Sequence, residues 1–393
     1  MDENEHSCQT LIVGGGCAGL TCALKLREAG EPFVLLSKDI GGRIRYLDEY
    51  DMNFGAVFFM QGYRHAKELL VPGKLVLPSL FDLECHLQLG RGYGVLSRPV
   101  IGAAPQLLGF LNYLKKTFQP RYEAFKLTCE TVEMTEAIER DPYIKGLFET
   151  SAEQFIQDEG FPKAARALVS QFVHACTGSR IGTLNALDYL NCAMGIIDAS
   201  TRFRFDAEEV RVQLSCEKSR VVDGEVARIE RGERRRWAAI DAEGMRWEAD
   251  NLVLATPADI AQRLLGEACG PYEIRKASEL HAYKVEGTIK QDYAGHALHL
   301  FDESIPLINI AARDDGAYEV FTCTPLDMDI FFEDYEVLHR EDWPQALFTN
   351  PSIVLEQDLG EGLYRIGDHN ALGLEPAAIS GVFAANRILG VRA

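Results

Sequence analysis

A glycine-rich stretch at residues 10–20 restricts the possible folds of this 393-residue chain more than any other segment. Residues 11–13, Leu-Ile-Val, are typical of a short buried strand, and Gly14, Gly16 and Gly19 follow in the pattern G-x-G-x-x-G. Apolar residues at helical spacing come next. The first glycine permits a tight turn, the second lets a pyrophosphate approach the backbone, and the third lets the helix pack on the sheet. The stretch therefore predicts a dinucleotide-binding unit with the phosphates at a helix N-terminus.

Composition limits the partners and the size of the protein. A formal net charge of −19 leaves no excess of Lys and Arg to follow a phosphate backbone, so we expect no nucleic acid partner. The length allows two domains or one large domain with insertions. A hydrophobic content of 47% is sufficient for a sizeable core.

The ten cysteines are scattered without a C-x-x-C pair, which indicates free thiols in a reducing compartment. The first six residues are acidic and polar, unlike a secretory signal. No apolar run approaches the roughly 18 residues of a spanning helix. We therefore expect a cytoplasmic protein without a membrane span. The sequence carries no indication of its oligomeric state.

A second buried strand is predicted at residues 33–36, and its end is unusual. A dinucleotide-binding fold places an acidic residue there to hold the adenosine ribose, but this chain has Ser37 followed by Lys38. A serine binds a ribose hydroxyl less strongly than a carboxylate does. A small polar residue and a base also suit the 2′-phosphate of NADP, so an NAD(P)-dependent reductase is a rival hypothesis.

The following segment carries a family resemblance. Gly41-Gly42-Arg43 comes after the second strand, and Gly55-Ala56 follows a few residues later. These motifs resemble the flavin-containing amine oxidase superfamily, which includes protoporphyrinogen oxidases and phytoene desaturases. The resemblance implies that Gly42 and Arg43 contact the diphosphate of FAD, and that Gly55 and Ala56 lie beside the flavin ring.

The C-terminal region resembles the same superfamily. A predicted strand ends at Gly367-Asp368, and a helical pattern starts near Glu375. A carboxylate at a strand end is suited to ribityl hydroxyls, and a helix N-terminus at Pro376-Ala377 would stabilise negative charge on the reduced flavin. Two such signatures at opposite ends of the chain favour FAD over NADP. No cysteine follows Cys323, so we expect the FAD to be non-covalent.

The middle of the chain predicts an insert. Short strands near residues 74–89 precede helical patterns that extend to about residue 194. Residues 221–229 are expected to form a hairpin with its turn at Asp223-Gly224, and residues 231–236 a second hairpin tip. The strand ending at Thr256 resembles the one that returns under the adenosine, and the resemblance implies that Val226 contacts adenine.

Catalytic residues are harder to identify. By resemblance to amine oxidases, Lys284 on a predicted strand is the candidate that reaches flavin N5 through water. His296 and His299 would face opposite sides of a strand, so we expect no metal site. At Gly373 the amine oxidases have an aromatic residue of a cage over the flavin, and its absence puts simple amine oxidation in doubt.

The sequence thus predicts an α/β protein with a Rossmann-like FAD-binding domain of the Gly-Arg type and an inserted α+β substrate domain. The FAD domain would comprise residues 1–60, 211–267 and 350–393, and the substrate domain residues 61–210 and 268–349. The expected function is an FAD-dependent oxidase or dehydrogenase that oxidises CH–NH, CH–CH or CH–OH of a small molecule. A non-redox flavoenzyme such as an isomerase, or a non-catalytic flavin-binding protein, would carry the same motifs. The expected FAD-binding residues are Gly14, Gly16, Cys17, Ala18, Gly19, Ser37, Lys38, Gly42, Arg43, Gly55, Ala56, Val226, Thr256, Gly367, Asp368, Pro376 and Ala377.

Overall fold

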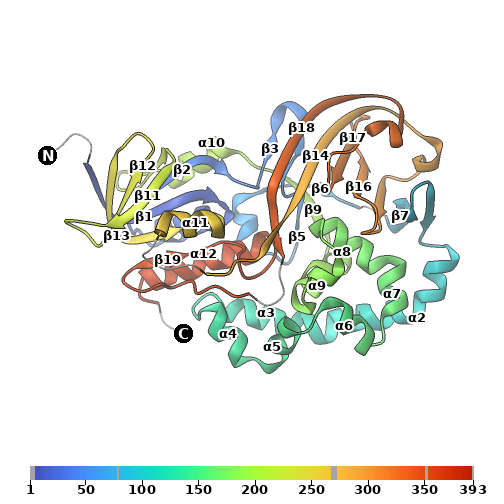
Figure 1. Cartoon of the computed structure of the whole chain (residues 1–393), viewed down its shortest axis with the longest axis horizontal. Coiled ribbons are helices and arrows are strands. Elements are labelled where there is room, and N and C mark those ends of the chain that lie inside the picture. The colour runs from blue at the N-terminus through green and yellow to red at the C-terminus, as the bar shows by residue number, and fades with distance from the viewer. Residues whose placement is uncertain (1–4, 78, 267–271, 350–352, 392–393) are drawn as a thin grey trace.

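The computed structural model describes residues 5–77, 79–266, 272–349 and 353–391. The molecule is elongated, with one mixed sheet at one end and a second sheet above a layer of helices at the other (Figure 1). The fold is α/β, as predicted, and its first sheet has the Rossmann-like arrangement expected for the N-terminal unit. The predicted domain boundaries stay predictions, and those at 267 and 350 lie outside the described residues.

The first sheet is built around β1 (Glu5–Gly16). Its strand order is β10-β2-β1-β13-β12-β11, with β2 at Phe33–Gly41 and β13 at Arg246–Leu254 both parallel to β1. The strand β19 (Leu363–Arg365) pairs with the second half of β13, which brings the C-terminal segment beside the start of the chain. The carboxyl ends of β1, β2, β13 and β19 therefore meet at one edge, where ligands of such sheets bind.

Two helices cover one face of this sheet. Helix α1 (Cys17–Glu28) follows β1 directly, and α12 (Leu374–Ile388) packs against it. A Cβ on Gly381 would lie 2.2 Å from the carbonyl oxygen of Ala18, so the helices approach too closely for any larger residue there. Ile12, Leu20, Leu35 and Val253 are fully buried in the core between helices and sheet.

The predicted hairpin at residues 221–229 is wrong. Strand β10 (Arg220–Asp223) pairs in parallel with β2, whereas β11 (Val226–Arg231) pairs with β12 (Trp237–Asp241), at the other end of the strand order. The Asp223-Gly224 sequence therefore connects strands with different partners and is not a hairpin turn. The second hairpin tip, between β11 and β12, is confirmed.

The second sheet has the order β18-β14-β17-β16-β15-β7-β8. The long strands β14 (Lys276–Ile289) and β18 (Phe332–Thr349) are paired along their length and extend from the first sheet toward the far end of the molecule (Figure 1). Next come β17 (Tyr318–Thr322), β16 (Leu307–Ala312) and β15 (Leu298–Phe301). At the outer edge lie β7 (Leu83–Gln88) and β8 (Arg91–Gly94).

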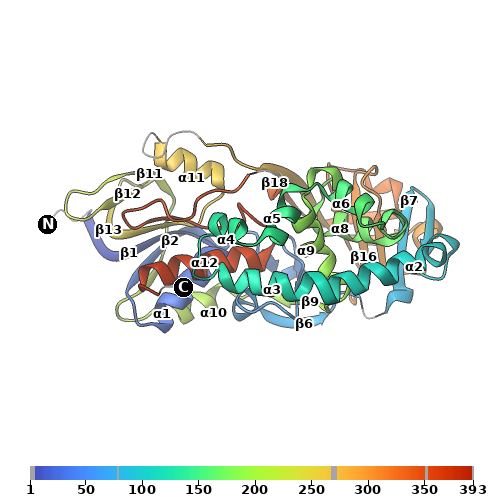
Figure 2. The same cartoon turned by 90° about the horizontal axis from the view of Figure 1, so that it is seen from below.

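A small sheet joins the two parts, with β9 (Ser200–Arg204) between β5 (Phe58–Met60) and β6 (Val71–Leu75). The helical layer contains α2 (Arg98–Tyr113), α3 (Gln119–Thr128), α4 (Met134–Arg140), α5 (Pro142–Glu149), α6 (Ala152–Asp158), α7 (Pro162–Ala164), α8 (Ser170–Thr177) and α9 (Ala186–Ala193). Figure 2 shows α2 and α3 following each other along one side of this layer. Ser151 caps α6 by accepting a hydrogen bond from Gln154 N–H. Two further helices, α10 (Ala207–Leu214) and α11 (Ala258–Leu265), flank the first sheet. Among the described residues, no helix combines the length and the apolar character needed to cross a bilayer.

Candidate cofactor site

The three motif glycines have three different surroundings. Gly14 has a φ of +110°, and a Cβ on Gly19 would lie 2.0 Å from the carbonyl oxygen of Gly14. Gly16 has an ordinary φ of −79°, and a Cβ there would meet no protein atom within 4 Å. The fold therefore requires glycine at positions 14 and 19 but not at 16. The open space beside Gly16 is the cradle that a close-lying diphosphate needs.

The N-termini of two helices meet next to this space. Cys17 opens α1 and Leu374 opens α12, and the Cys17 thiol donates to the Leu374 carbonyl oxygen across 3.4 Å. No side chain caps either helix, so the free backbone N–H groups of their first turns, those of Cys17 and Ala18 in α1 among them, contribute to two converging positive ends. Pro376 and Ala377 lie in the first turn of α12, where Pro376 has no N–H and Ala377 N–H donates to the Gly373 carbonyl oxygen. Burial, followed by the Glu375 carboxylate, raises the pKa of Cys17 to about 12, which keeps its thiol neutral.

Arg43 and Asp368 form a bidentate ion pair at the edge of the same space. The guanidinium donates to both carboxylate oxygens, at 2.8 and 2.6 Å, and also to the carbonyl oxygen of Ala346 at 2.7 Å. Burial alone would raise the pKa of Asp368, but the charge and hydrogen bonds of Arg43, together with weaker effects of His369 and the backbone, lower that pKa overall. The pair joins the Gly-Gly-Arg motif to the Gly-Asp motif and fixes both around the predicted cofactor path.

The other expected residues lie around this pair. Ala56 N–H donates to the carbonyl oxygen of Arg43, and a Cβ on Gly55 would lie 2.1 Å from that oxygen, so Gly55 is needed for close packing. A Cβ on Gly42 would approach the Cα of Gly16 to 3.2 Å. Gly367 N–H donates to the Ser380 hydroxyl. Val226, at the start of β11, lies away from this pair, in the core cluster that contains Leu36, and its contact with adenine stays a prediction.

Ser37 has a different role from the predicted one. Its hydroxyl accepts a hydrogen bond from Gly15 N–H at 2.8 Å and donates one to the carbonyl oxygen of Asp39 at 2.6 Å. The donor is therefore used within the chain and is not directed at a ribose. Strand β2 continues beyond Ser37 as far as Gly41 and pairs Ile40 with Gly15. Ser37 thus holds the glycine-rich turn in place.

The surroundings of Lys38 oppose the NADP hypothesis. Its side chain is exposed, and its ammonium lies 3.4 Å from the Glu225 carboxylate. A phosphate at this position would contact the lysine only beside that carboxylate and Asp39, and it would gain little from the single exposed cation.

His369 is the residue that most clearly lacks a partner. It is 4% exposed, and neither ring nitrogen forms a hydrogen bond. Its ring lies under Gly367, where a Cβ would come within 2.8 Å of it, and directly after Asp368. The hydroxyl of Thr256, just after the end of β13, is also buried without a partner. These unpaired polar atoms are donors and acceptors suited to the hydroxyls and ring atoms of a flavin nucleotide.

We expect His369 to make the cofactor-free protein sensitive to acid. Burial lowers the pKa of His369 from 6.5 to about 4, against the opposing effect of Asp368. The neutral, buried His369 therefore costs the folded protein nothing above pH 6.5. As the pH falls from 6.5 toward 4, the free energy of unfolding decreases by up to about 3 kcal/mol, because only the unfolded chain takes up the proton. Urea unfolding at pH 7.5 and 4.5 measures the loss, and His369→Gln should reduce it. An equal loss in the variant would contradict this assignment.

Lys284 is paired within the chain, and its catalytic role stays a prediction. Its ammonium lies 2.5 Å from the Asp315 carboxylate and donates to the Tyr50 carbonyl oxygen at 2.7 Å. Along β18, its pairing partner His339 lies seven residues from Ala346, which contacts Arg43, and this is about 23 Å of strand. The resemblance that suggested a catalytic role rests on a short local pattern. The contacts of Lys284 assign it to joining β14 to the residue 50 loop.

We expect Lys284→Met to leave the rate of flavin reoxidation by O₂ unchanged within about twofold and to lower stability by about 1 kcal/mol, because one hydrogen-bonded charge pair is lost. Stopped-flow absorbance and urea unfolding give the two values. A reoxidation rate reduced tenfold or more would restore the catalytic assignment.

Tyr63 lies where the aromatic residue missing at position 373 would project. A Cβ on Gly373 would be 3.8 Å from the Tyr63 hydroxyl. The Tyr63 ring packs against both the core around α1 and α12 and the core of the helical layer. Burial, and then the Glu375 carboxylate, raise the pKa of Tyr63 well above its usual range, so the phenol stays protonated. An aromatic side chain from another segment therefore lies beside position 373.

A buried ion pair fixes the loop between β19 and α12. Arg275 donates to the Asp188 carboxylate at 2.7 Å and to the carbonyl oxygen of Asn370 at 2.6 Å, and both charged side chains are 3% exposed or less. Asp188 also accepts from Leu372 N–H. The helical layer, through α9, thus holds the loop that carries His369.

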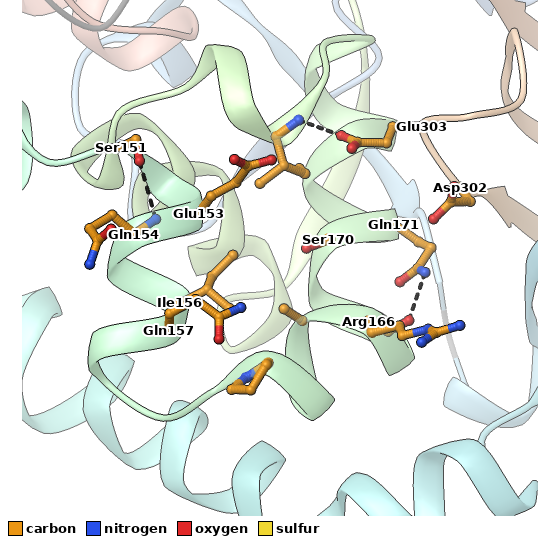
Figure 3. Close-up of a pocket in the computed structure, with 13 residues that line it drawn as sticks. Ser151, Glu153, Gln154, Ile156, Gln157, Arg166, Ser170, Gln171, Asp302 and Glu303 are labelled. Atoms are coloured by element: carbon orange, nitrogen blue, oxygen red, sulfur yellow. Dashed lines mark hydrogen bonds between the residues drawn. The ribbon is translucent and has the colours of Figure 1, made fainter.

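A separate cavity of about 620 Å³ opens in the helical layer between α6 and α8 (Figure 3). Glu153, Gln171 and Glu303 are among the residues that line it, and none of its lining residues is in the cofactor set. The cavity is therefore distinct from the site around Arg43.

Residues 9–44 match a family model described as an FAD binding domain. Solved structures match the whole chain. A CLA-producing fatty acid isomerase from P. acnes is 13% identical with a TM-score of 0.69, and the match covers 97% of this chain and 98% of that one. Putrescine oxidase with bound putrescine is 11% identical with a TM-score of 0.70, covering 98% and 100%. An oxidoreductase from Methanosarcina mazei is 13% identical with a TM-score of 0.67, covering 96% and 100%. A search of curated proteins returns no match.

The chain has the FAD-dependent amine oxidase-like fold. Its cofactor is FAD, in agreement with the family-model match and with the cradle at Gly16. The sequence motifs identified the segments that meet around Gly16 and the Arg43–Asp368 pair, and the contacts of their residues with FAD stay predictions. The motifs did not identify His369 or Tyr63. The sequence signal for His369 is its position directly after the Gly-Asp motif. Tyr63 carried no signal, because its closeness to Gly373 depends on the tertiary fold.

Proposed function

We propose that this protein is an FAD-dependent oxidoreductase that removes a hydride from a carbon of a small molecule. The observation that carries the proposal is the open, glycine-lined cradle at Gly16, next to two converging helix N-termini and the Arg43–Asp368 pair. FAD, when bound, supplies a hydride acceptor at N5. The chain's part is to hold the cofactor, exclude water and orient the substrate carbon.

The surroundings of Tyr63 support a mainly apolar substrate face. The first electrostatic neighbour of Tyr63 is the buried Glu375 carboxylate, whose oxygens accept hydrogen bonds from the backbone N–H groups of residues 64–66. The next neighbours are Cys192 and Cys176, whose pKa values burial raises, so both are neutral thiols. Arg275 and Asp188 neutralise each other behind this region. A substrate entering past Tyr63 would therefore meet aromatic and thiol groups, and we propose a substrate whose reacting CH group is flanked by apolar carbon.

The first experiment is an absorbance spectrum of the purified protein, followed by anaerobic mixing with amines, amino acids, alcohols and unsaturated fatty acids. Bleaching of the flavin band by one class would identify the reaction as CH–NH, CH–OH or CH–CH oxidation. Reoxidation by O₂ or by an artificial acceptor then separates an oxidase from a dehydrogenase. A purified protein that contains no flavin and takes up no added FAD would contradict the proposal.

A second candidate is a non-redox flavoenzyme that moves a double bond. The glycine at position 373, the apolar surroundings of Tyr63 and the structural likeness to a fatty acid isomerase favour it. Its test is product analysis by mass spectrometry after incubation with polyunsaturated fatty acids. An isomer of unchanged mass, formed without net flavin reduction, supports this candidate, whereas a product two hydrogens lighter supports oxidation.

A further inference from the structure

A cluster of two histidines and a glutamate lies at the outer edge of the second sheet, far from the FAD site. The strands β7 and β15 pair in parallel, and His299 on β15 is directly opposite Glu84 on β7. His86 lies two residues after Glu84, so both project from the same face of β7. In Figure 1, β7 is at the opposite end of the molecule from β1 and α12.

Three donor atoms of this cluster form an almost equilateral triangle. The distance from His86 Nε2 to His299 Nδ1 is 3.1 Å, and Glu84 Oε2 lies 3.2 Å from the first and 3.1 Å from the second. A tetrahedral zinc ion with bonds of roughly 2.0–2.2 Å holds its ligand atoms about 3.3 Å apart. The triangle therefore has the dimensions of one face of a metal coordination shell.

One hydrogen bond, between His86 Nε2 and His299 Nδ1, leaves the other polar atoms of this cluster without partners. His86 and His299 are 0% and 1% exposed, yet Glu84 Oε2 and the outer ring nitrogens of both histidines form no hydrogen bond. A neutral imidazole has a single N–H. If one histidine donates to the other, the Glu84 carboxylate still faces the lone pair of the accepting nitrogen. If each histidine directs its proton outward, three lone pairs converge. A divalent cation accepts all three lone pairs at once.

A glycine, an aromatic ring and a partly exposed histidine surround the cluster. A Cβ on Gly92 would lie 2.2 Å from the Glu84 carboxyl carbon, so glycine on β8 makes room for this side chain. The ring of Phe301 stacks on His86 with centroids 4.6 Å apart. His296 stands on the solvent side, partly exposed, with Nε2 3.9 Å from Glu84 Oε1.

His296 precedes β15 and is not part of a strand, so the argument from strand alternation that excluded a metal does not apply to it.

We propose that Glu84, His86 and His299 bind a divalent first-row transition-metal ion, with Zn²⁺ as the best-matched ion. Two imidazoles and one carboxylate are a zinc ligand set that leaves one position open, and His296 or water can fill that position. The ion would link strands more than 200 residues apart in sequence and so stabilise the sheet edge.

The test uses full-length protein without a histidine tag, produced in zinc-supplemented medium and analysed by elemental mass spectrometry. We expect about one equivalent of metal in the native protein. Glu84→Gln and His299→Ala should weaken Zn²⁺ binding by at least about 100-fold, more than the loss of an outer-shell partner does. His281→Gln is the matched control, because His281 is a buried histidine of the same sheet beside two carboxylates, Asp342 and Glu279. It should keep its metal.

Titration of chelator-treated native protein with ZnCl₂ decides the question even if a variant does not fold. A stoichiometric rise in Tm, with an unchanged flavin spectrum, supports the site. Less than about 0.1 equivalent of any divalent metal in the native protein, together with no Tm response to Zn²⁺, overturns it. Flavin content is read separately, so failure here is distinguishable from failure of the proposed function.

Discussion

A Gly16→Val variant is expected to fold normally and to bind FAD at least about 100-fold more weakly, which corresponds to about 2.7 kcal/mol. The backbone at Gly16 has an ordinary φ of −79°, and a Cβ there meets no protein atom within 4 Å, so the folded chain itself does not resist a side chain. The FAD diphosphate would clash with a side chain at position 16, because it must approach this backbone closely. Flavin absorbance after FAD titration and urea unfolding of the cofactor-free protein give the two values.

Gly19→Ala is the matched control. Its new methyl group would lie 2.0 Å from the carbonyl oxygen of Gly14, inside the turn between β1 and α1. We expect a loss of about 3 kcal/mol in the free energy of unfolding, because the helix must move away from the sheet. If Gly16→Val unfolds the cofactor-free protein as strongly as Gly19→Ala does, then position 16 is structural and the cradle interpretation fails.

Arg275→Met is expected to cost about 3–5 kcal/mol of stability. The substitution keeps much of the side-chain length but leaves Asp188, which is 2% exposed, as a buried carboxylate without its cation. The carbonyl oxygen of Asn370 also loses its guanidinium donor. Because these contacts fix the loop that carries His369, FAD affinity should fall together with stability. Urea unfolding followed by circular dichroism, and FAD titration, measure both.

The double variant Arg275→Met/Asp188→Asn should regain part of this loss, since it removes the uncompensated charge. Arg140→Met tests the same change on the surface, where Arg140 pairs with Glu136 and both side chains are more than half exposed. We expect an effect below about 1 kcal/mol there. A loss for Arg275→Met that is no larger than the loss for Arg140→Met would refute a clamping role for the buried pair.

Local patterns predicted much of this fold because the decisive signals are local. The strand, glycine turn and helix of residues 10–28 are set by side-chain size over a few residues, and the structure confirms them. The Gly-Gly-Arg and Gly-Asp motifs are separately visible in the sequence. Their meeting in the Arg43–Asp368 ion pair follows from the parallel sheet that places both strand ends at one edge.

Features set by distant partners were not predictable in this way. The Asp223-Gly224 pair has the composition of a hairpin turn, but the strands on either side find better partners in β2 and β12. Ser37 is predicted from its position to bind the cofactor, but its hydroxyl bonds to Gly15 N–H. That bond depends on the register between β1 and β2, which local sequence does not reveal. The Glu84, His86 and His299 cluster depends on a strand pairing across more than 200 residues, which local spacing does not reveal.

The direct packing of α1 on α12 has a consequence for biosynthesis. Residues 29–373 separate these two helices, yet both of their N-termini border the space for FAD. The first strand and helix emerge early from the ribosome, but their cofactor site is incomplete until α12 has been translated. We therefore expect FAD to enter after translation of α12, and a nascent chain stalled before residue 374 to expose its glycine-rich turn without the cover of that helix.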